Sequence, residues 1–194
     1  MAAGRVPAPT VRALYTETID VDGRNAKPTG EALTTVYLAF GANLGDRAGT
    51  IARAIDLLAA RGVAPLARSP LYETDPVTPD RQPDYLNALL RAETPLSPQA
   101  LLALCLEVEQ ALGRRRPAGR ALAPREIDVD LLLYGTEVIA DPPSLIVPHP
   151  RLLERPFVRI PLADVAAPGL RHPITGEPLD RATPDPSVRL LTGA

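Results

Sequence analysis

Two aspartates, Asp128 and Asp130, are set into an otherwise apolar run directly behind a segment rich in arginine. If residues 127–134 form a β-strand, side chains alternate between its faces, so both carboxylates point to the same side. Two carboxylates on a half-buried strand repel each other and lose hydration, so a cation must hold them there. Arginine or Mg²⁺ could supply that charge. Mg²⁺ usually takes one or two protein carboxylates and fills its other positions with water and substrate phosphates. The spacing therefore favours a magnesium site for phosphate chemistry.

Five arginines and no acid lie between Gly113 and Glu126, namely Arg114, Arg115, Arg116, Arg120 and Arg125. Proline and glycine in the same segment exclude a helix. The guanidinium fork binds phosphate oxygens and stabilises charge on a transferring phosphoryl group. Alone, such a segment is more often a solvated surface loop. Its position beside the acid pair instead favours an anionic substrate bridged by metal.

The tetrapeptide Ile-Asp-Val-Asp occurs twice, at residues 19–22 and at residues 127–130. The first copy, with Asp20 and Asp22, is followed by a turn and has no basic cluster nearby. The second enters an apolar strand behind the arginines. We therefore assign the site to the second copy.

Apolar periodicity and turn residues predict the elements that position these side chains. Asp46 can cap a helix over residues 46–61, and Ser97 with Pro98 can begin a second helix that reaches Gly113. Cys105 lies on the apolar stripe of that helix and is predicted to be core. Strands are expected at residues 35–40, 63–72, 85–92 and 127–134, with an irregular proline-rich loop over residues 74–83.

This order of elements is typical of the split βαβ pattern. We expect an α+β fold with a ferredoxin-like βαββαβ core, an antiparallel sheet with helices packed on it, and long proline-rich loops. A net charge of -2 gives no overall basic field for nucleic acid, and one cysteine excludes an internal disulfide framework. No apolar run approaches the roughly 20 residues of a membrane span. The N-terminus also lacks a secretory signal. The composition favours a cytoplasmic protein.

Several short motifs along residues 35 to 180 resemble, in order, the 6-hydroxymethyl-7,8-dihydropterin pyrophosphokinase family of folate biosynthesis. Each motif alone is weak, but a collinear series of them rarely arises by chance. The motifs are Val36 to Arg47, Tyr72 to Thr74, Gln82 to Asn87, Glu109 to Arg114, Pro124 to Asp130, Val147 to Pro150 and Arg155 to Phe157.

The resemblance implies transfer of a pyrophosphoryl group from ATP to the hydroxymethyl group of the pterin, with release of AMP. It also implies two Mg²⁺ ions on Asp128 and Asp130. Residues two apart on a strand lie about 6.6 Å apart and can reach such a pair, which holds the attacking and leaving oxygens of an in-line displacement. The chemistry is then mostly positioning and charge neutralisation, without a protein nucleophile. The catalytic arginines implied are Arg114, Arg116 and Arg125, and Arg125 is fixed most firmly, by Pro124.

The resemblance also assigns two sets of binding residues. Those expected at the nucleotide are Glu109, Arg120, Leu131, His149 and Arg155, and those expected at the pterin are Thr74, Val77, Tyr85, Asn87 and Phe157. Phe157 offers an aromatic face and Asn87 a donor and an acceptor for the ring edge. Without the resemblance, Phe157 and Tyr85 could equally be core residues, His149 an ordinary loop histidine and Glu109 a surface residue.

Two positions depart from the family pattern. Where the family has Arg-Trp-Gly-Pro-Arg, residues 120–125 read Arg-Ala-Leu-Ala-Pro-Arg, one residue longer and without the tryptophan. Aromatic stacking on a base is worth roughly 1–3 kcal/mol, so weaker closure over the ligand is expected. Ala42 replaces the usual serine.

We expect an N-terminal extension of unknown role over residues 1–33, a pyrophosphokinase domain over residues 34–180 and a C-terminal tail over residues 181–194. The protein is expected to be a monomer that binds small molecules, not nucleic acid or membranes. Two rival functions stay open. One is a nucleotidyl or glycosyl transferase that uses the same acid pair, and the other is a binding protein that kept the fold and lost turnover.

Overall fold

A computed structural model of the chain describes residues 32–76, 81–115, 123–142 and 144–192. The chain divides into two compact units, Met1–Leu33 and Thr34–Ala194, and the account below concerns the second. The first copy of the repeated tetrapeptide, with Asp20 and Asp22, lies outside the described residues.

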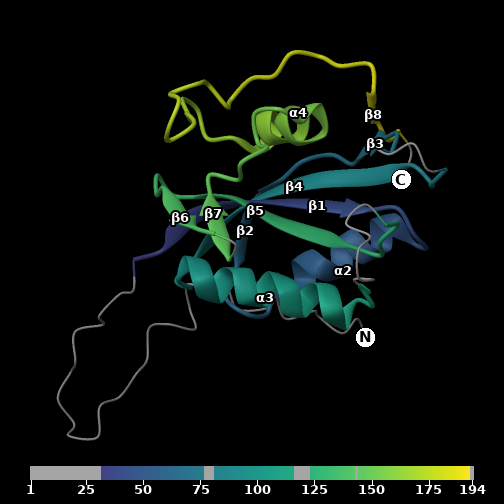
Figure 1. Cartoon of the computed structure of the whole chain (residues 1–194), viewed down its shortest axis with the longest axis horizontal. Coiled ribbons are helices and arrows are strands. Elements are labelled where there is room, and N and C mark those ends of the chain that lie inside the picture. The colour runs from purple at the N-terminus through teal and green to yellow at the C-terminus, as the bar shows by residue number, and fades with distance from the viewer. Residues whose placement is uncertain (1–31, 77–80, 116–122, 143, 193–194) are drawn as a thin grey trace, which may run out of the picture. The chain divides into compact units, whose positions relative to one another are not determined.

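The main sheet has six strands in the order β5-β1-β4-β3-β8, with β2 also paired to β4, and all its pairs are antiparallel (Figure 1). A second, two-stranded sheet contains β6 and β7. The α+β class predicted from the sequence is confirmed, and the ferredoxin-like description of the core stays a prediction. The strands are β1 Thr34–Ala42, β2 Ala64–Arg68, β3 Tyr72–Thr74, β4 Tyr85–Thr94, β5 Asp128–Tyr134, β6 Ile139–Asp141, β7 Leu145–Val147 and β8 Val188–Leu190.

The described residues form three helices, which cover the sheet from both faces (Figure 1). The helices α2 (Arg47–Ala59) and α3 (Pro98–Ala111) pack on the first face, and α4 (Pro156–Val165) packs on the second. Two cores result. The α2/α3 core includes Leu38 and Val129, and the α4 core includes Tyr37 and Leu162.

The ends of α2 and α3 follow from local chemistry. The carboxylate of Asp46 accepts a hydrogen bond of 3.0 Å from Gly49 N, and the hydroxyl of Ser97 accepts one of 3.2 Å from Ala100 N. Gly62 and Gly113, just past the two helices, both have φ of 92°. Glycine adopts this left-handed conformation at little cost, so each helix ends there.

The expected strand over residues 63–72 is divided into β2 and β3. Ser69 still pairs with β4, since its backbone N donates to Leu89 O at 2.9 Å and its hydroxyl accepts from Leu89 N at 2.9 Å. Pro70, which follows it, has no N–H to donate to the ladder. The single strand predicted from the sequence was wrong for this reason.

Strand β5 contains an irregularity that alternation alone did not reveal. Tyr37 pairs with Leu133 but Leu38 pairs with Leu131, so Leu132 is an extra residue. This β-bulge resets the alternation. Leu131 faces the α2/α3 core, whereas Leu132 and Leu133 both belong to the α4 core. The regular alternation expected over residues 127–134 was therefore wrong beyond Leu131, since it would have placed Leu133 on the same face as Val129 and Leu131.

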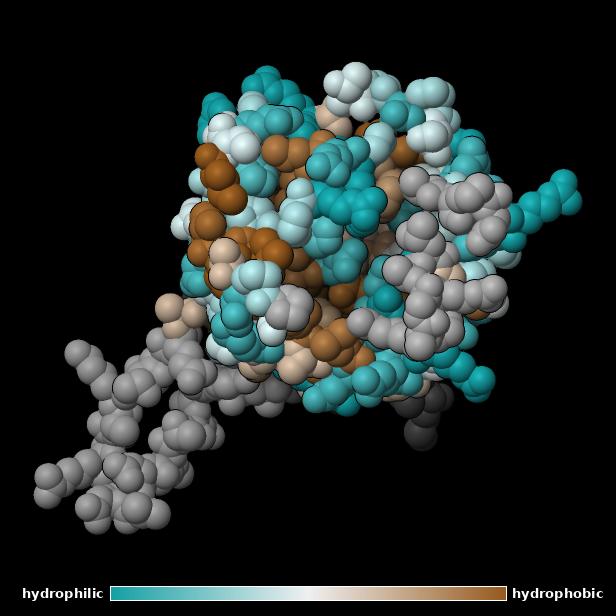
Figure 2. Space-filling model, in the orientation of Figure 1, coloured by the Kyte–Doolittle hydropathy of each residue, from teal (hydrophilic) through white to brown (hydrophobic). Residues whose placement is uncertain are grey.

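Apolar side chains also reach the surface beside the small sheet. Val138 and Ile146 belong to the exposed large hydrophobic residues. In Figure 2, brown hydrophobic atoms gather on the left of the displayed face, the side on which Figure 1 places β6 and β7.

Candidate active site

The two acids of β5 lie on the face of the sheet that also carries α4. Val129 and Leu131, which alternate with them, are buried in the α2/α3 core. The side chains of Asp128 and Asp130 are only partly covered, at 22% and 38% exposed. Asp130 is therefore open to an incoming cation.

Gly41 of β1 lies between the acid pair and a second group of predicted site residues. It is the register partner of both Asp128 on β5 and Asn87 on β4. Side chains of register partners point to the same face, so Asn87 and Asp128 flank a position that has no side chain. Neighbouring strands are about 4.8 Å apart, which places the two backbones about 10 Å apart. A Cβ at Gly41 would lie 3.4 Å from Asn87 Oδ1. Gly41 therefore places no side chain between Asn87 and Asp128 on this face of the sheet.

Asp128 forms ion pairs with two arginines. Arg114 Nη1 contacts one of its carboxylate oxygens and Arg125 Nη1 contacts the other. Burial favours the protonated form of Asp128, but the two guanidinium groups outweigh it and hold the pKa of Asp128 below its usual value. Asp128 is therefore an ionised, doubly paired carboxylate.

Asp130 has much weaker compensation. Among the described residues, Asp130 is paired with Arg155, whose Nη1 lies 3.9 Å from its Oδ2. Burial and the neighbouring charge of Asp128 raise the pKa of Asp130 to about 6, with Arg155 opposing the shift. The arginines therefore compensate the charge of Asp128 more fully than that of Asp130.

Glu109 of α3 supports the Asp128 cluster from below the sheet. Its side chain is 2% exposed, so the surface alternative raised from the sequence was wrong. Oε1 accepts a hydrogen bond of 2.8 Å from Val129 N and pairs with Arg114. Glu109 therefore holds both the strand that carries the acids and an arginine that contacts Asp128.

Asn43, at the end of β1, positions Arg125. Its Oδ1 accepts from Arg125 N at 2.8 Å, and its own backbone N donates to Arg125 O at 3.1 Å. Its Nδ2 donates to Gln82 Oε1 and to Pro83 O, both at 3.2 Å. Asn43 is 1% exposed. No role was predicted for Asn43 from the sequence, although a polar residue directly after a buried strand is a signal that could have identified Asn43.

Most residues predicted to bind the pterin are brought together. Asn87 Nδ2 donates to Thr74 Oγ1 at 2.9 Å, and both side chains are buried. The guanidinium of Arg125 lies 5.7 Å from the ring centroid of Tyr85, and that of Arg155 lies 5.5 Å from the centroid of Phe157. Each aromatic is therefore covered by an arginine that also contacts an acid of the pair. Val77 lies outside the described residues.

The residues predicted at the nucleotide are less uniformly placed. His149 N donates to Leu132 O at 2.9 Å, which fixes the loop beside β5. Burial, with Arg155 and Arg151 nearby, lowers the pKa of His149, so the imidazole is neutral at pH 7. Leu131 is 5% exposed in the α2/α3 core. Arg116 and Arg120 lie outside the described residues.

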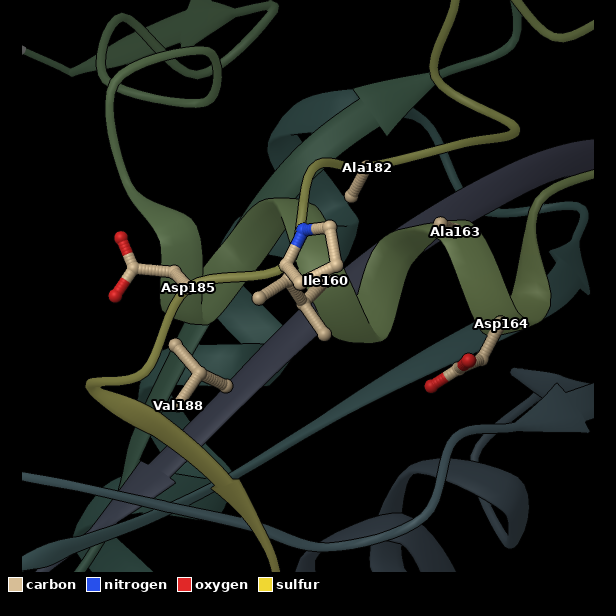
Figure 3. A pocket seen from close by; sticks show the side chains of 7 residues that line it. Ile160, Ala163, Asp164, Ala182, Asp185 and Val188 are labelled. Atoms are coloured by element: carbon tan, nitrogen blue, oxygen red, sulfur yellow. The ribbon is translucent and has the colours of Figure 1, made fainter.

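A cavity of about 250 Å³ lies elsewhere, between α4 and the C-terminal segment (Figure 3). None of the predicted site residues lines it. Among the residues described, His, Cys, Asp and Glu side chains form no group of three or more that could hold a metal ion. The described helices include none that is both long and apolar enough to cross a membrane.

The fold and site together define an α+β protein with an acid pair and clustered arginines on one strand and its adjoining loops. Residues 37–167 match the family model described as 7,8-dihydro-6-hydroxymethylpterin-pyrophosphokinase, or HPPK. The chain belongs to this family, and the family and enzyme class predicted from the sequence are confirmed.

The relatives include single enzymes and longer proteins. The chain is 42% identical over 135 residues to 2-amino-4-hydroxy-6-hydroxymethyldihydropteridine pyrophosphokinase of Methylorubrum extorquens, covering 69% of this chain and 84% of that one. It is 41% identical over 141 residues to the folic acid synthesis protein fol1 of Pneumocystis carinii, covering 73% of this chain but 18% of the relative. Wild-type HPPK-DHPS of Plasmodium falciparum with SDX-DHP has a similar fold, with a TM-score of 0.59 at 13% identity over 77% of this chain and 43% of that chain.

Proposed function

We propose that this chain transfers a pyrophosphoryl group from ATP to the hydroxymethyl group of 6-hydroxymethyl-7,8-dihydropterin, giving its diphosphate ester and AMP. Family membership supports the reaction class. The observation that carries the proposal for this chain is the row Asn87, Gly41 and Asp128 across three adjacent strands. It places the residues proposed for the pterin and for the phosphates on one face of the sheet, with no side chain between them.

The acid pair fits a divalent cation. Asp128 and Asp130 present oxygen ligands on one face, and burial together with the charge of Asp128 raises the pKa of Asp130, so a bound cation would stabilise its ionised form. Mg²⁺ needs only one or two carboxylates when phosphates and water complete its shell. We propose that these two aspartates hold two Mg²⁺ ions, which when bound neutralise phosphate charge and orient the reacting oxygens. Because the described residues form no larger ligand group, binding of metal should depend on the nucleotide.

Arg114 and Arg125 have two tasks in this proposal. Before nucleotide binds, they hold Asp128 ionised. A triphosphate offers the same guanidinium groups several anionic oxygens, and bidentate contacts to phosphate are strong. Transfer of these arginines from Asp128 to the phosphates frees the carboxylate for the cation. Arg116 and Arg120 are proposed to join them there.

The remaining proposed contacts fall into those on the pterin side and those on the nucleotide side of the site. Asn87 and Thr74 bind the edge of the pterin, and Tyr85 and Phe157 its faces, with Val77 nearby. Glu109, His149 and Arg155 bound the nucleotide side, and Leu131 contributes there only through its backbone, because its side chain lies in the α2/α3 core. We further propose that the protein acts as a monomer in the cytoplasm.

The direct test is an assay with ATP, Mg²⁺ and 6-hydroxymethyl-7,8-dihydropterin, with the products separated by chromatography. AMP and the pterin diphosphate in equal amounts are expected. Release of pyrophosphate or of a nucleoside diphosphate would instead indicate the rival transferase. Tight binding of both ligands without AMP would indicate a binding protein.

A calorimetric titration tests the metal proposal separately. The ligand is a non-hydrolysable ATP analogue, added with and without Mg²⁺ and pterin. We expect heat of binding only when nucleotide and Mg²⁺ are both present. Equal nucleotide affinity with and without Mg²⁺ contradicts the proposed role of the acid pair.

A further inference from the structure

The connection between β3 and β4 begins and ends with an acid. Thr74 and Tyr85 form the last register pair of this hairpin, and Asp75 and Asp84 follow directly. Like charges that face each other across a hairpin repel and separate its two strands. A cation between them is therefore needed to keep the two ends of this connection together.

Arg189 of β8 is that cation. Its Nη2 lies 2.9 Å from Asp75 Oδ1 and 3.1 Å from Asp84 Oδ2. The position is set by the backbone, because β8 pairs with β3 and places Arg189 opposite Glu73. Glu73 is itself paired with Arg47 at 2.8 Å. One arginine thus bridges both ends of the β3–β4 connection.

The C-terminal segment that carries Arg189 lies against α4. Figure 3 shows Ile160 of α4 pointing toward the segment that carries Ala182 and Val188. Tyr72 of β3, the strand that pairs with β8, donates a hydrogen bond of 2.8 Å to Asp164 of α4. Strand β8 therefore has support from both β3 and α4.

Asp84 connects Arg189 to the candidate site through a short series of contacts. Its carbonyl oxygen accepts a hydrogen bond of 2.7 Å from Arg47. The preceding carbonyl, Pro83 O, accepts from Asn43, which positions Arg125. The following residue, Tyr85, lies beneath the guanidinium of Arg125. A displacement of Asp84 is thereby transmitted to both neighbours.

We infer that Arg189 is a positioning residue for the pterin side of the site: by neutralising Asp75 and Asp84 it fixes the segment that leads into Tyr85. The inference rests on the proposed function for its kinetic consequence. It assigns to β8, at the far edge of the sheet from β5, a role in binding the smaller substrate. Arg189 does not itself touch the reacting groups.

Steady-state kinetics of Arg189→Ala, with each substrate varied separately, gives the first test. The KM for the pterin should rise about 3- to 10-fold, the size that an exposed ion-pair network supports. The KM for ATP should stay within about twofold, because the acid pair and Arg114 are untouched. Arg189→Lys keeps the charge, so its KM for the pterin should lie between those of Arg189→Ala and the wild type.

The repulsion between Asp75 and Asp84 can be tested more directly with a double variant. Asp75→Asn removes one of the two facing charges, so adding it to Arg189→Ala should bring the pterin KM back to within about twofold of wild type. Arg61→Ala is the matched control, since Arg61 is 45% exposed and pairs with Glu107 at 2.8 Å, whereas Arg189 is 44% exposed. This control should change neither KM. An unchanged pterin KM in Arg189→Ala, no rescue by Asp75→Asn, or an equal rise in both KM values overturns the inference.

Hydrogen–deuterium exchange tests the inference independently of the reaction. In Arg189→Ala, deuterium uptake should increase in peptides covering residues 81–88 and stay unchanged in α3. If wild type makes no AMP, the proposed function fails, while the exchange result still decides on Arg189. No increase over residues 81–88 overturns the positioning role.

Discussion

Two ion clusters of opposite composition lie at the two ends of the main sheet. At β5, one acid, Asp128, lies between Arg114 and Arg125, whose side chains are largely buried. At β8, one base, Arg189, lies between Asp75 and Asp84, whose side chains are 66% and 40% exposed. The arrangements are mirror images in charge, but they differ in contact with water.

This difference in exposure to water determines what each ion cluster can do. Around Asp128, water screens the charges weakly, so the arginines shift its pKa and a neighbouring acid responds in the opposite direction. Around Arg189, water and salt screen the charges, and the cluster mainly fixes backbone position. The buried cluster is suited to chemistry and the exposed one to alignment.

Breaking the buried acid pair should have the largest effect. Asp128→Ala and Asp130→Ala should each lower kcat by at least about 100-fold, because transition-state charge on the phosphates loses its stabilisation. Asp20→Ala and Asp22→Ala, in the other copy of the tetrapeptide, should leave kcat unchanged. The measurement is AMP formation at saturating substrates, with circular dichroism to check folding. Equal losses from both pairs would show that the site was assigned to the wrong copy.

Glu109→Ala and Glu107→Ala compare the stability cost of losing a buried charge and an exposed charge on the same helix. Glu109→Ala leaves Arg114 and Val129 N without their buried partner and should lower the free energy of unfolding by about 3 kcal/mol. Glu107→Ala, two residues earlier on α3, breaks the exposed pair with Arg61 and should cost less than about 1 kcal/mol. Urea denaturation of the two variants measures the difference. Similar values for both would contradict the distinction drawn between the clusters.

Asn43→Ala tests the connection between Arg125 and the segment at Pro83. Its loss releases Arg125 from the segment at Pro83, and a misplaced catalytic group should lower kcat about 10-fold or more. Ser69→Ala is the control, because Ser69 is also a buried polar residue with a hydrogen bond to the β4 backbone. Both variants should lose about 1–3 kcal/mol of stability, but only Asn43→Ala should lose activity. A comparable fall in kcat for Ser69→Ala would count against a specific role of Asn43.

The smallest expected effect concerns Cys105, whose thiol lies close enough to the buried acids for them to raise its pKa. Burial, with Glu109 and Asp130 nearby, raises the pKa of Cys105 from 9.0 to about 12. The folded state therefore keeps the thiol proton that the unfolded chain releases near pH 9. The stability from this group is complete below pH 9 and is lost as pH rises toward 12. At pH 8, a thiol reagent should label Cys105 only in denaturant, and rapid labelling of folded protein would contradict its burial.

What could be predicted from the sequence was mostly local. The cap residues Asp46 and Ser97 and the glycines Gly62 and Gly113 fixed the two helices, because each acts within a few residues of its own position. The family could be recognised for a different reason, since the order of several motifs is visible without any structure.

The rest depends on contacts between distant segments. Glu109 is a charged residue near a helix end, and only the packing of α3 beneath β5 shows that it is buried. The extra residue in β5 arises from its pairing with β1, which alternation cannot reveal. Likewise, nothing local in residues 181–194 indicated that Arg189 joins the edge of the main sheet.

The bulge at Leu132 makes the two halves of β5 unequal in their tolerance of length changes. Deleting the residue at 132 would remove the bulge and one side chain from the α4 core, but Asp128 and Asp130 would stay in phase and Leu133 and Tyr134 would keep their present facing. Deleting Val129 would instead bring the two acids to opposite sides of the sheet, because a one-residue slip inverts the facing of a strand. The same loss of one amino acid would thus be a packing defect at one end of the strand and would dismantle the cation site at the other.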